Sequence, residues 1–282
     1  MPQTTIDLLN KGVMANRTDR FRRGNVVHLP DRGSVVIGGD IHGHRRNFER
    51  LVTYADLADH PERHIVLQEI IHGGPEDDTG GCLSYQLLFD VIRYKLSDPD
   101  RVHLVMGNHD TACISGSDVM KNGKEMNRAM SSALDREFPH ASREVKLAIR
   151  QFLFSQPLAV RCANRVWISH SLPADRFVEL FDTGVFGREL RPEDCEKPGP
   201  AYLLTWGRRH SQAALDRLAE RFDADLFVLG HQAQTHGWCQ AGKNLIILAC
   251  DHNHGCLVEV DLTRPWTAGE LADHIVPLAS IH

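Results

Sequence analysis

Short apolar runs that end in polar residues restrict the fold of this chain more than any other feature of its sequence. Five runs have the length of a β-strand, at 34–38, 64–69, 102–106, 165–169 and 226–229. Amphipathic stretches with apolar residues three and four apart separate several of them, and this alternation is typical of an α/β domain. In open α/β sheets, ligands bind at the carboxyl ends of the strands. The sequence therefore predicts an α/β domain with a polar site at one sheet edge.

The remaining elements fit the same class of domain. Further strands are predicted at 157–161, 244–249 and 256–260, and the first of these forms a hairpin with 165–169. Helices are predicted where the apolar spacing is helical, at 45–57, 83–96, 117–136, 141–154 and 211–222. No linker long enough to divide the 282 residues is present. We expect an N-terminal extension over residues 1–30 and a single domain over residues 31–282.

Composition excludes several classes of protein. Hydrophobic residues make up 42% of the chain, charged residues 24%, and the net charge of −5 provides no basic field for nucleic acid. The seven cysteines are odd in number and form no C-x-x-C pair, so a disulfide framework is not indicated. The N-terminus lacks the apolar core of a signal peptide, and no later stretch reaches membrane-spanning length. We expect a cytoplasmic protein without nucleic-acid or membrane partners.

The polar residues at the strand ends are oxygen and nitrogen donors. Taken one at a time, each has an ordinary explanation, such as a turn at Gly230-His231 or a helix cap at Asn108-His109-Asp110. Their occurrence at five strand ends favours a shared site. Donors of this kind without thiolate suit Mn²⁺, Fe or Zn²⁺. The candidate donors are Asp40, His42, Glu69, Asn108, His109, His170 and His231.

The order of these motifs resembles that of the calcineurin-like metallophosphoesterases, and within them the protein serine/threonine phosphatase branch. The resemblance runs from about Gly33 to about Asp261. It rests on GDIHGH (39–44), GNHD (107–110), FSQPLAVRCANRVWISHSLP (154–173), LLTWGRR (203–209) and LGHQ (229–232). It implies two facing mixed β-sheets flanked by helices, with a dinuclear metal site at the sheet edge.

The resemblance also implies which residues bind the two metal ions. Asp40 and His42 would hold the first ion, and Glu69 would bridge the two. Asn108, His170 and His231 would hold the second ion. A hydroxide between two such ions attacks phosphorus directly, so no protein nucleophile is required.

The second motif departs from the family. The usual Gly-Asp is replaced by Gln68-Glu69, and the usual Asp-Arg-Gly that follows is replaced by His72-Gly73-Gly74. In the family that Asp orients the catalytic histidine and that Arg binds phosphate. Both roles are therefore vacant at their expected positions.

The chemistry needs an acid and a phosphate-binding cation as well. His109 is the predicted general acid, and Asp110 is its predicted anionic partner, with Asp77 and Asp78 as alternatives in a loop. Predicted phosphate ligands are Arg208 and Arg209, because guanidinium groups bind phosphate in a bidentate manner. Further substrate contacts are predicted for His72 and His254. Arg45 and Arg46 are candidates as well, because they begin a predicted helix whose N-terminus favours anions.

The sequence thus predicts a dinuclear metal-dependent phosphoesterase with a phosphorylated substrate, and a serine/threonine phosphoprotein is one candidate. A nucleotide phosphohydrolase similar to the symmetrical diadenosine tetraphosphatases shares the same motifs. The lost Asp-Arg-Gly favours a third alternative, a metal-bearing binding protein with weak catalysis. Retention of His109 argues against this last alternative, because the residue is not a metal ligand in the family.

Overall fold

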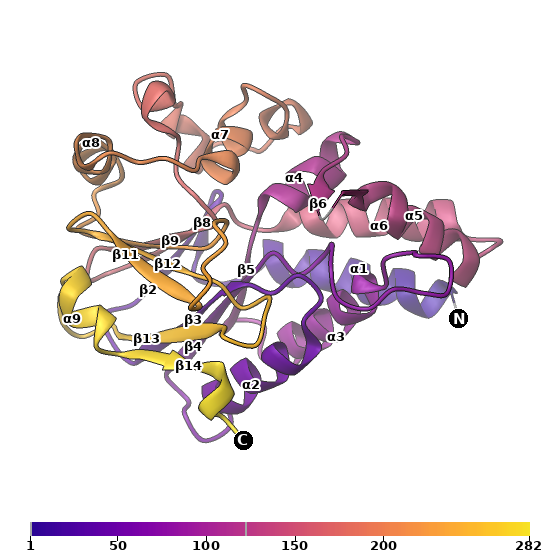
Figure 1. Cartoon of the computed structure of the whole chain (residues 1–282), viewed down its shortest axis with the longest axis horizontal. Coiled ribbons are helices and arrows are strands. Elements are labelled where there is room, and N and C mark those ends of the chain that lie inside the picture. The colour runs from indigo at the N-terminus through magenta and orange to yellow at the C-terminus, as the bar shows by residue number, and fades with distance from the viewer. Residues whose placement is uncertain (1, 122) are drawn as a thin grey trace.

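Two β-sheets packed face to face form the centre of the protein. The computed structural model describes residues 2–121 and 123–282 (Figure 1). The larger sheet has the strand order β1-β2-β8-β9-β10-β12-β11, and the smaller sheet has the order β14-β13-β3-β4-β5. Both sheets mix parallel and antiparallel pairs. The predicted α/β fold of two facing mixed sheets flanked by helices is confirmed.

The strands are as follows: β1 (Arg22–Arg23), β2 (Val26–Leu29), β3 (Ser34–Asp40), β4 (Arg63–Gln68), β5 (Val102–Val105), β6 (Met120–Lys121), β7 (Lys124–Glu125), β8 (Ala159–Cys162), β9 (Val166–Ser169), β10 (Leu226–Leu229), β11 (Trp238–Ala241), β12 (Leu245–Leu248), β13 (Cys256–Asp261) and β14 (Ile275–Pro277). The helices are α1 (Pro2–Arg17), α2 (Arg45–Ala55), α3 (Ser84–Ser97), α4 (Asn108–Ser115), α5 (Met126–Glu137), α6 (Ser142–Ser155), α7 (Pro200–Trp206), α8 (Gln212–Phe222) and α9 (Ala268–Ala272).

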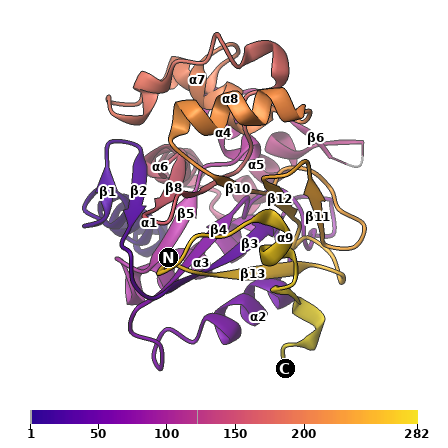
Figure 2. The ribbon, with the colours of Figure 1, turned by 90° about the vertical axis from the view of Figure 1, so that its left-hand side faces the viewer.

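Alternating side chains of the strands divide the core into an inner and an outer part. In β3, Val35 and Ile37 join the cluster between the two sheets, whereas Val36 faces the helices. Figures 1 and 2 show α2 and α3 over the smaller sheet and α8 over the larger one. On the α8 side, Phe222 packs against Trp167 and Phe227. Strands covered on both faces explain the continuous apolar runs in the sequence.

Parallel pairing brings the polar strand ends together. Strands β3, β4 and β5 are mutually parallel in the smaller sheet, and β9, β10 and β12 are parallel in the larger one. A parallel bridge between Asp40 and Ala249 connects the two sheets at this edge. The carboxyl ends of both parallel groups therefore meet at one place.

The N-terminal residues belong to the body of the fold. Residues 2–30, which we expected as an extension, form α1, β1 and β2, while residue 1 lies outside the described residues. Helix α1 packs against α3 and α6, and β2 pairs with β8 in parallel. The hydrophobic periodicity of α1 is weak, which explains why that helix was not predicted.

The predicted hairpin of β8 and β9 is confirmed, but the helix predicted at 117–136 is wrong in its first half. Residues 120–125 include the paired strands β6 and β7, and α5 begins only at Met126. Gly116 and Gly123 both have positive φ, at 75° and 77°, which an α-helix cannot accommodate. Among the described residues, no helix is both long and apolar enough to cross a lipid bilayer.

Candidate metal centre

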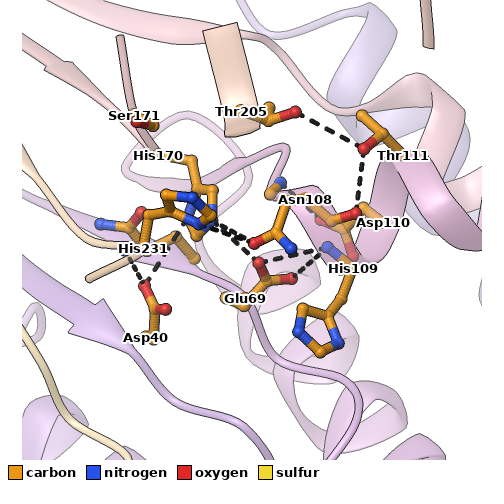
Figure 3. A network of polar contacts seen from close by, with 12 residues as sticks. Asp40, Glu69, Asn108, His109, Asp110, Thr111, His170, Ser171, Thr205 and His231 are labelled. Atoms are coloured by element: carbon orange, nitrogen blue, oxygen red, sulfur yellow. Dashed lines mark hydrogen bonds and ion pairs between the residues drawn. The ribbon is translucent and has the colours of Figure 1, made fainter. Parts of the chain in front are cut away.

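The side chains predicted to bind metal converge at the shared sheet edge. Asp40 ends β3, Glu69 follows β4, and Asn108 begins α4 directly after β5. From the larger sheet, His170 follows β9 and His231 follows β10. Figure 3 shows these side chains pointing toward one another. Acceptor atoms of Asp40, Glu69 and His170 all lie within 4.8 Å of one another.

The ring of His170 is oriented by a glutamine. Gln68 donates its side-chain N–H to the Gly38 carbonyl at 3.0 Å, so its oxygen faces Nδ1 of His170, also at 3.0 Å. Burial lowers the pKa of His170, so the ring is neutral and carries its proton on Nδ1. The other ring nitrogen, Nε2, is left with a free lone pair.

That lone pair of His170 faces other acceptors. Nε2 lies 2.9 Å from Oδ1 of Asn108, 2.9 Å from Oε2 of Glu69 and 3.2 Å from Nδ1 of His231. Nδ1 of His231 in turn lies 2.9 Å from the same Asn108 oxygen. Neutral imidazole nitrogens, an amide oxygen and a carboxylate this close repel one another unless a bound cation or a shared proton lies between them. The residues present therefore fit a bound cation.

The Asp40 side of the centre is held by backbone contacts. Oδ1 of Asp40 accepts the N–H of His231 at 2.7 Å, and Oδ2 lies 3.7 Å from Nε2 of His42. The other ring nitrogen of His42 lies 3.0 Å from the carbonyl oxygen of Ile71, which fixes the ring. Nε2 of His42 is therefore available as a ligand beside the Asp40 carboxylate.

Glu69 lies where a bridging ligand is required. Its carboxylate accepts the His109 N–H at 3.2 and 3.3 Å and contacts Nε2 of His170. The side chain of Glu69 is one methylene longer than the Asp that is usual in the family, and it has room only because position 107 is a glycine. A Cβ at Gly107 would lie 2.5 Å from Oε2 of Glu69, so any larger residue there would displace the carboxylate.

Burial without compensating charge shifts the acid–base equilibria of the site. It raises the pKa of Asp40 to about 6 and that of Glu69 to about 8. It lowers the pKa of His42 to about 3, with the Lys121 charge as the next cause, and holds that of His231 well below its usual value. Bound cations would reverse the shift of the carboxyl groups by favouring their anionic form.

Strained backbone is concentrated at the same place. Among the described residues, seven other than glycine have positive φ, and four of them belong to this site. They are His42 at 44°, Glu69 at 50°, His72 at 66° and His231 at 67°. Such conformations cost roughly 1–3 kcal/mol each and persist where surrounding contacts enforce them.

His109 and His72 form a buried imidazole pair. Their Nδ1 atoms lie 3.0 Å apart, so His72 occupies the place beside His109 that the family's Asp would take. Burial is the main cause that holds the pKa of His109 far below its usual value, and the neighbouring His42 and His72 lower it further. Nε2 of His72 is buried and makes no hydrogen bond within residues 2–121 and 123–282. His72 thus contacts the predicted acid rather than the open part of the site.

Asp110 does not partner His109. Its Oδ2 accepts the N–H of Gly107 at 2.9 Å and the side-chain N–H of Gln156 at 3.0 Å, which caps α4. Within the part of the chain that the structure describes, it makes no hydrogen bond to the His109 ring. The role predicted for Asp110 as anionic partner is therefore wrong, and its carboxylate serves the helix instead. Asp77 pairs with Arg136 at the surface.

The tryptophan–arginine segment reaches the centre from α7. Trp206 donates its indole N–H to Oγ1 of Thr111 at 3.1 Å, which ties α7 to α4. Arg208 then donates to the carbonyl oxygen of the ligand candidate His231 at 3.1 Å. Arg208 and Arg209 are exposed and line an open cavity of about 470 Å³. The phosphate-binding role of both arginines stays a prediction.

Other predicted contacts are not brought to the centre. His254 is exposed, and its contact is a backbone one to the ring of His252. Arg45 pairs with Asp90 at 2.7 Å on the surface of α2. Gln68, which orients the ring of His170, was not predicted as a site residue, and neither was Lys121 of β6, which lines a cavity with His42. The sequence offered a signal for Gln68 alone, because it stands beside Glu69 in a motif already singled out.

Comparisons with known proteins agree with this geometry. The family model for calcineurin-like phosphoesterases matches residues 33–234. A search of curated proteins found no match. Among solved structures, a protein serine/threonine phosphatase from Saccharomyces cerevisiae with similarity to human phosphatase PP5 superimposes with a TM-score of 0.69 at 14% identity, covering 99% of this chain and 93% of that one. A cold-active protein-tyrosine phosphatase from a psychrophilic Shewanella superimposes with a TM-score of 0.60 at 17% identity, covering 89% and 82%.

The structural neighbours share the fold, and the family match spans most of the chain, including every predicted metal ligand. The chain therefore belongs to the calcineurin-like phosphoesterases, enzymes that hydrolyse phosphoric esters.

Proposed function

We propose that the protein is a dinuclear metal-dependent phosphatase that hydrolyses phosphate monoesters, with phosphoproteins as the candidate substrate class. The observation that carries the proposal is the acceptor cluster around Nε2 of His170, where Asn108, Glu69 and His231 approach within 3.2 Å. Asp40, His42 and Glu69 would hold one ion. Glu69, Asn108, His170 and His231 would hold the other.

Two bound cations would lower the pKa of a water molecule between them and neutralise phosphate oxygens. The donor set of carboxylate, amide and imidazole suits Mn²⁺, Fe or Zn²⁺. The chain's own residues supply the remaining chemistry. Arg208, fixed at the carbonyl oxygen of His231, would pair with phosphate oxygens, and His109 would donate a proton to the departing oxygen.

Two solved protein phosphatases share the fold at 14% and 17% identity, and phosphoproteins are therefore the first substrate class to test. A screen of phosphopeptides and nucleotides on the Mn²⁺-loaded enzyme tests the substrate class. If the enzyme hydrolyses nucleotides but no phosphopeptide, the phosphoprotein assignment is wrong and a nucleotide phosphohydrolase is favoured.

The metal centre is tested by elemental analysis together with turnover of 4-nitrophenyl phosphate. We expect Asp40→Asn and His231→Ala to lose metal and activity together, because each removes a ligand. Asp90→Asn is the matched control, since Asp90 pairs with Arg45 on the surface, away from the centre. Full activity of the wild-type enzyme after complete removal of metal by a chelator would overturn the proposal.

A further inference from the structure

A cavity opens between the metal centre and the β6–β7 hairpin. Its volume is about 410 Å³. The lining includes His42 of the metal centre, Gly73 and Gly74 of the altered second motif, Lys121 and Lys124 of the hairpin, and Asp251. The cavity thus connects the position of the missing phosphate-binding arginine with two lysines from another part of the chain.

Position 73 cannot carry the missing arginine in this backbone. Gly73 has φ of 151°, a conformation that residues with a side chain rarely adopt. A Cβ there would lie 2.4 Å from the carbonyl oxygen of His42. Since His42 is itself a ligand candidate, this contact cannot relax without moving the metal centre. The phosphate-binding cation on this side must come from elsewhere.

Lys121 is placed to supply that cation. Its Nζ lies 3.2 Å from Oδ2 of Asp251, and both side chains are 25% exposed. This is the one hydrogen bond that its ammonium group makes to the described residues, so two of its three N–H groups remain for a ligand. Lys121 and the ligand candidate His42 line the same cavity, so the ammonium group faces the space beside the metal centre.

Lys124 differs from Lys121 although it lies on the same hairpin. Its Nζ pairs with Oε2 of Glu76 at 2.7 Å, and half of the Glu76 side chain is exposed. Lys124 is therefore held in a closer ion pair than Lys121, with a carboxylate that is more exposed than that of Asp251. Lys124 is a matched control, because it carries the same charge as Lys121, lies on the same hairpin and lines the same cavity.

We propose that Lys121 binds an oxygen of the substrate's phosphate group and takes the role of the arginine that is absent at position 73. The assignment rests on the proposed phosphatase function. Phosphate would compete with Asp251 for the ammonium group, and Asp251 holds the lysine in position when no substrate is bound. A lysine can replace an arginine here as a point charge, with less geometric selectivity.

The test is direct binding of inorganic phosphate to the Mn²⁺-loaded protein, measured by calorimetry. We expect Lys121→Met to weaken phosphate binding about 10-fold, as loss of one charged hydrogen bond does. Lys124→Met should change it less than about 3-fold, and Lys121→Arg should retain it. Metal content should equal that of the wild type in all three variants. Unchanged phosphate affinity in Lys121→Met, or an equal loss in Lys124→Met, would overturn the assignment.

Turnover of 4-nitrophenyl phosphate separates this assignment from the proposed function. If the wild type is active and Lys121→Met binds phosphate as the wild type does, the lysine assignment fails and the phosphatase stands. If the wild type hydrolyses no phosphate ester while Lys121→Met loses phosphate affinity, the phosphatase fails and the binding role stands. In an active enzyme, Lys121→Met should raise KM more than it lowers kcat.

Discussion

Nδ1 of His72 lies 3.0 Å from Nδ1 of His109, so two imidazoles meet where the family places a carboxylate beside the catalytic histidine. A carboxylate would stabilise the protonated form of His109, whereas a neutral imidazole can only accept one hydrogen bond from it. Burial also lowers the pKa of His72 to about 3, so His72 does not share a positive charge readily. The pair therefore favours a neutral His109, so little of the protonated form is present to act as general acid.

We expect His72→Asp to raise the pKa of His109 and so to increase the fraction of the residue that is protonated. A carboxylate at position 72 would attract the proton of His109, so hydrolysis of alkyl phosphates, which depends on leaving-group protonation, should rise by about 10-fold or more relative to hydrolysis of aryl phosphates. The measurement is kcat/KM for a series of leaving groups. His72→Asn, which has a similar size but no charge, is the control. Equal behaviour of the two variants would show that charge at position 72 does not govern the acid.

His109→Ala should retain both metal ions and lose activity. Among the described residues, the His109 ring makes no hydrogen bond to the acceptor cluster around His170, and it packs edge to face against the His42 ring. Its backbone N–H binds Glu69 and survives the substitution. We expect alkyl phosphates to lose about 10²–10⁴ in rate and aryl phosphates much less. Metal content and the two rates are measured on the same preparation. Equal losses for both substrate types would contradict the role of His109 as acid.

Glu69→Gln should weaken metal binding. The amide keeps the shape and can still accept the His109 N–H, but it loses the charge that holds two cations close together. We expect at least one ion to dissociate on dialysis, as measured by elemental analysis. Asp110→Asn is the matched control, since Asp110 is a nearby buried carboxylic acid whose two N–H contacts an amide oxygen can keep. Two retained ions in Glu69→Gln would exclude a bridging role.

The convergence of the candidate metal ligands could be predicted from the sequence because each lies at, or a few residues beyond, the end of an apolar strand. Parallel strands align their carboxyl ends, so Asp40, Glu69, Asn108, His170 and His231 meet without any knowledge of loops. This part of the site depends on local patterns that can be read directly from the sequence.

The residues that support the ligands could not be predicted in the same way. Gln68 contacts a ring 102 positions away, and Asp110 turns toward Gln156 because it caps α4. Lys121 was assigned to a helix, whereas the hairpin directs it to Asp251, 130 positions away. Such contacts are set by tertiary packing, and local spacing contains no record of them.

The last prediction concerns a buried ionic cluster at the opposite ends of the same strands. Asp19 accepts from Nδ1 of His103 at 2.9 Å and lies 3.8 Å from Nζ of Lys95, a side chain that is 1% exposed. Nε2 of His103 lies 3.1 Å from Nδ1 of His64. The cluster joins the segment after α1 to β4 and β5, so the N-terminal residues should contribute to stability.

Asp19→Asn should lower the free energy of unfolding by about 3 kcal/mol at pH 7, because it leaves the buried Lys95 charge without its anionic partner. Although burial opposes ionisation, His103 and Lys95 hold the pKa of Asp19 below its usual value of 3.8. A carboxylate with a depressed pKa stabilises the fold fully above its unfolded-state pKa and loses its contribution as the pH falls through the folded-state pKa.

The difference in unfolding free energy between wild type and Asp19→Asn should therefore be constant near neutral pH and shrink below about pH 4. Thermal unfolding of the metal-free proteins across that range measures it, with Asp31→Asn, a solvent-exposed position, as the control. A difference that stays the same at the acidic end would show that the charge of Asp19 is not what holds the N-terminal segment to the sheet.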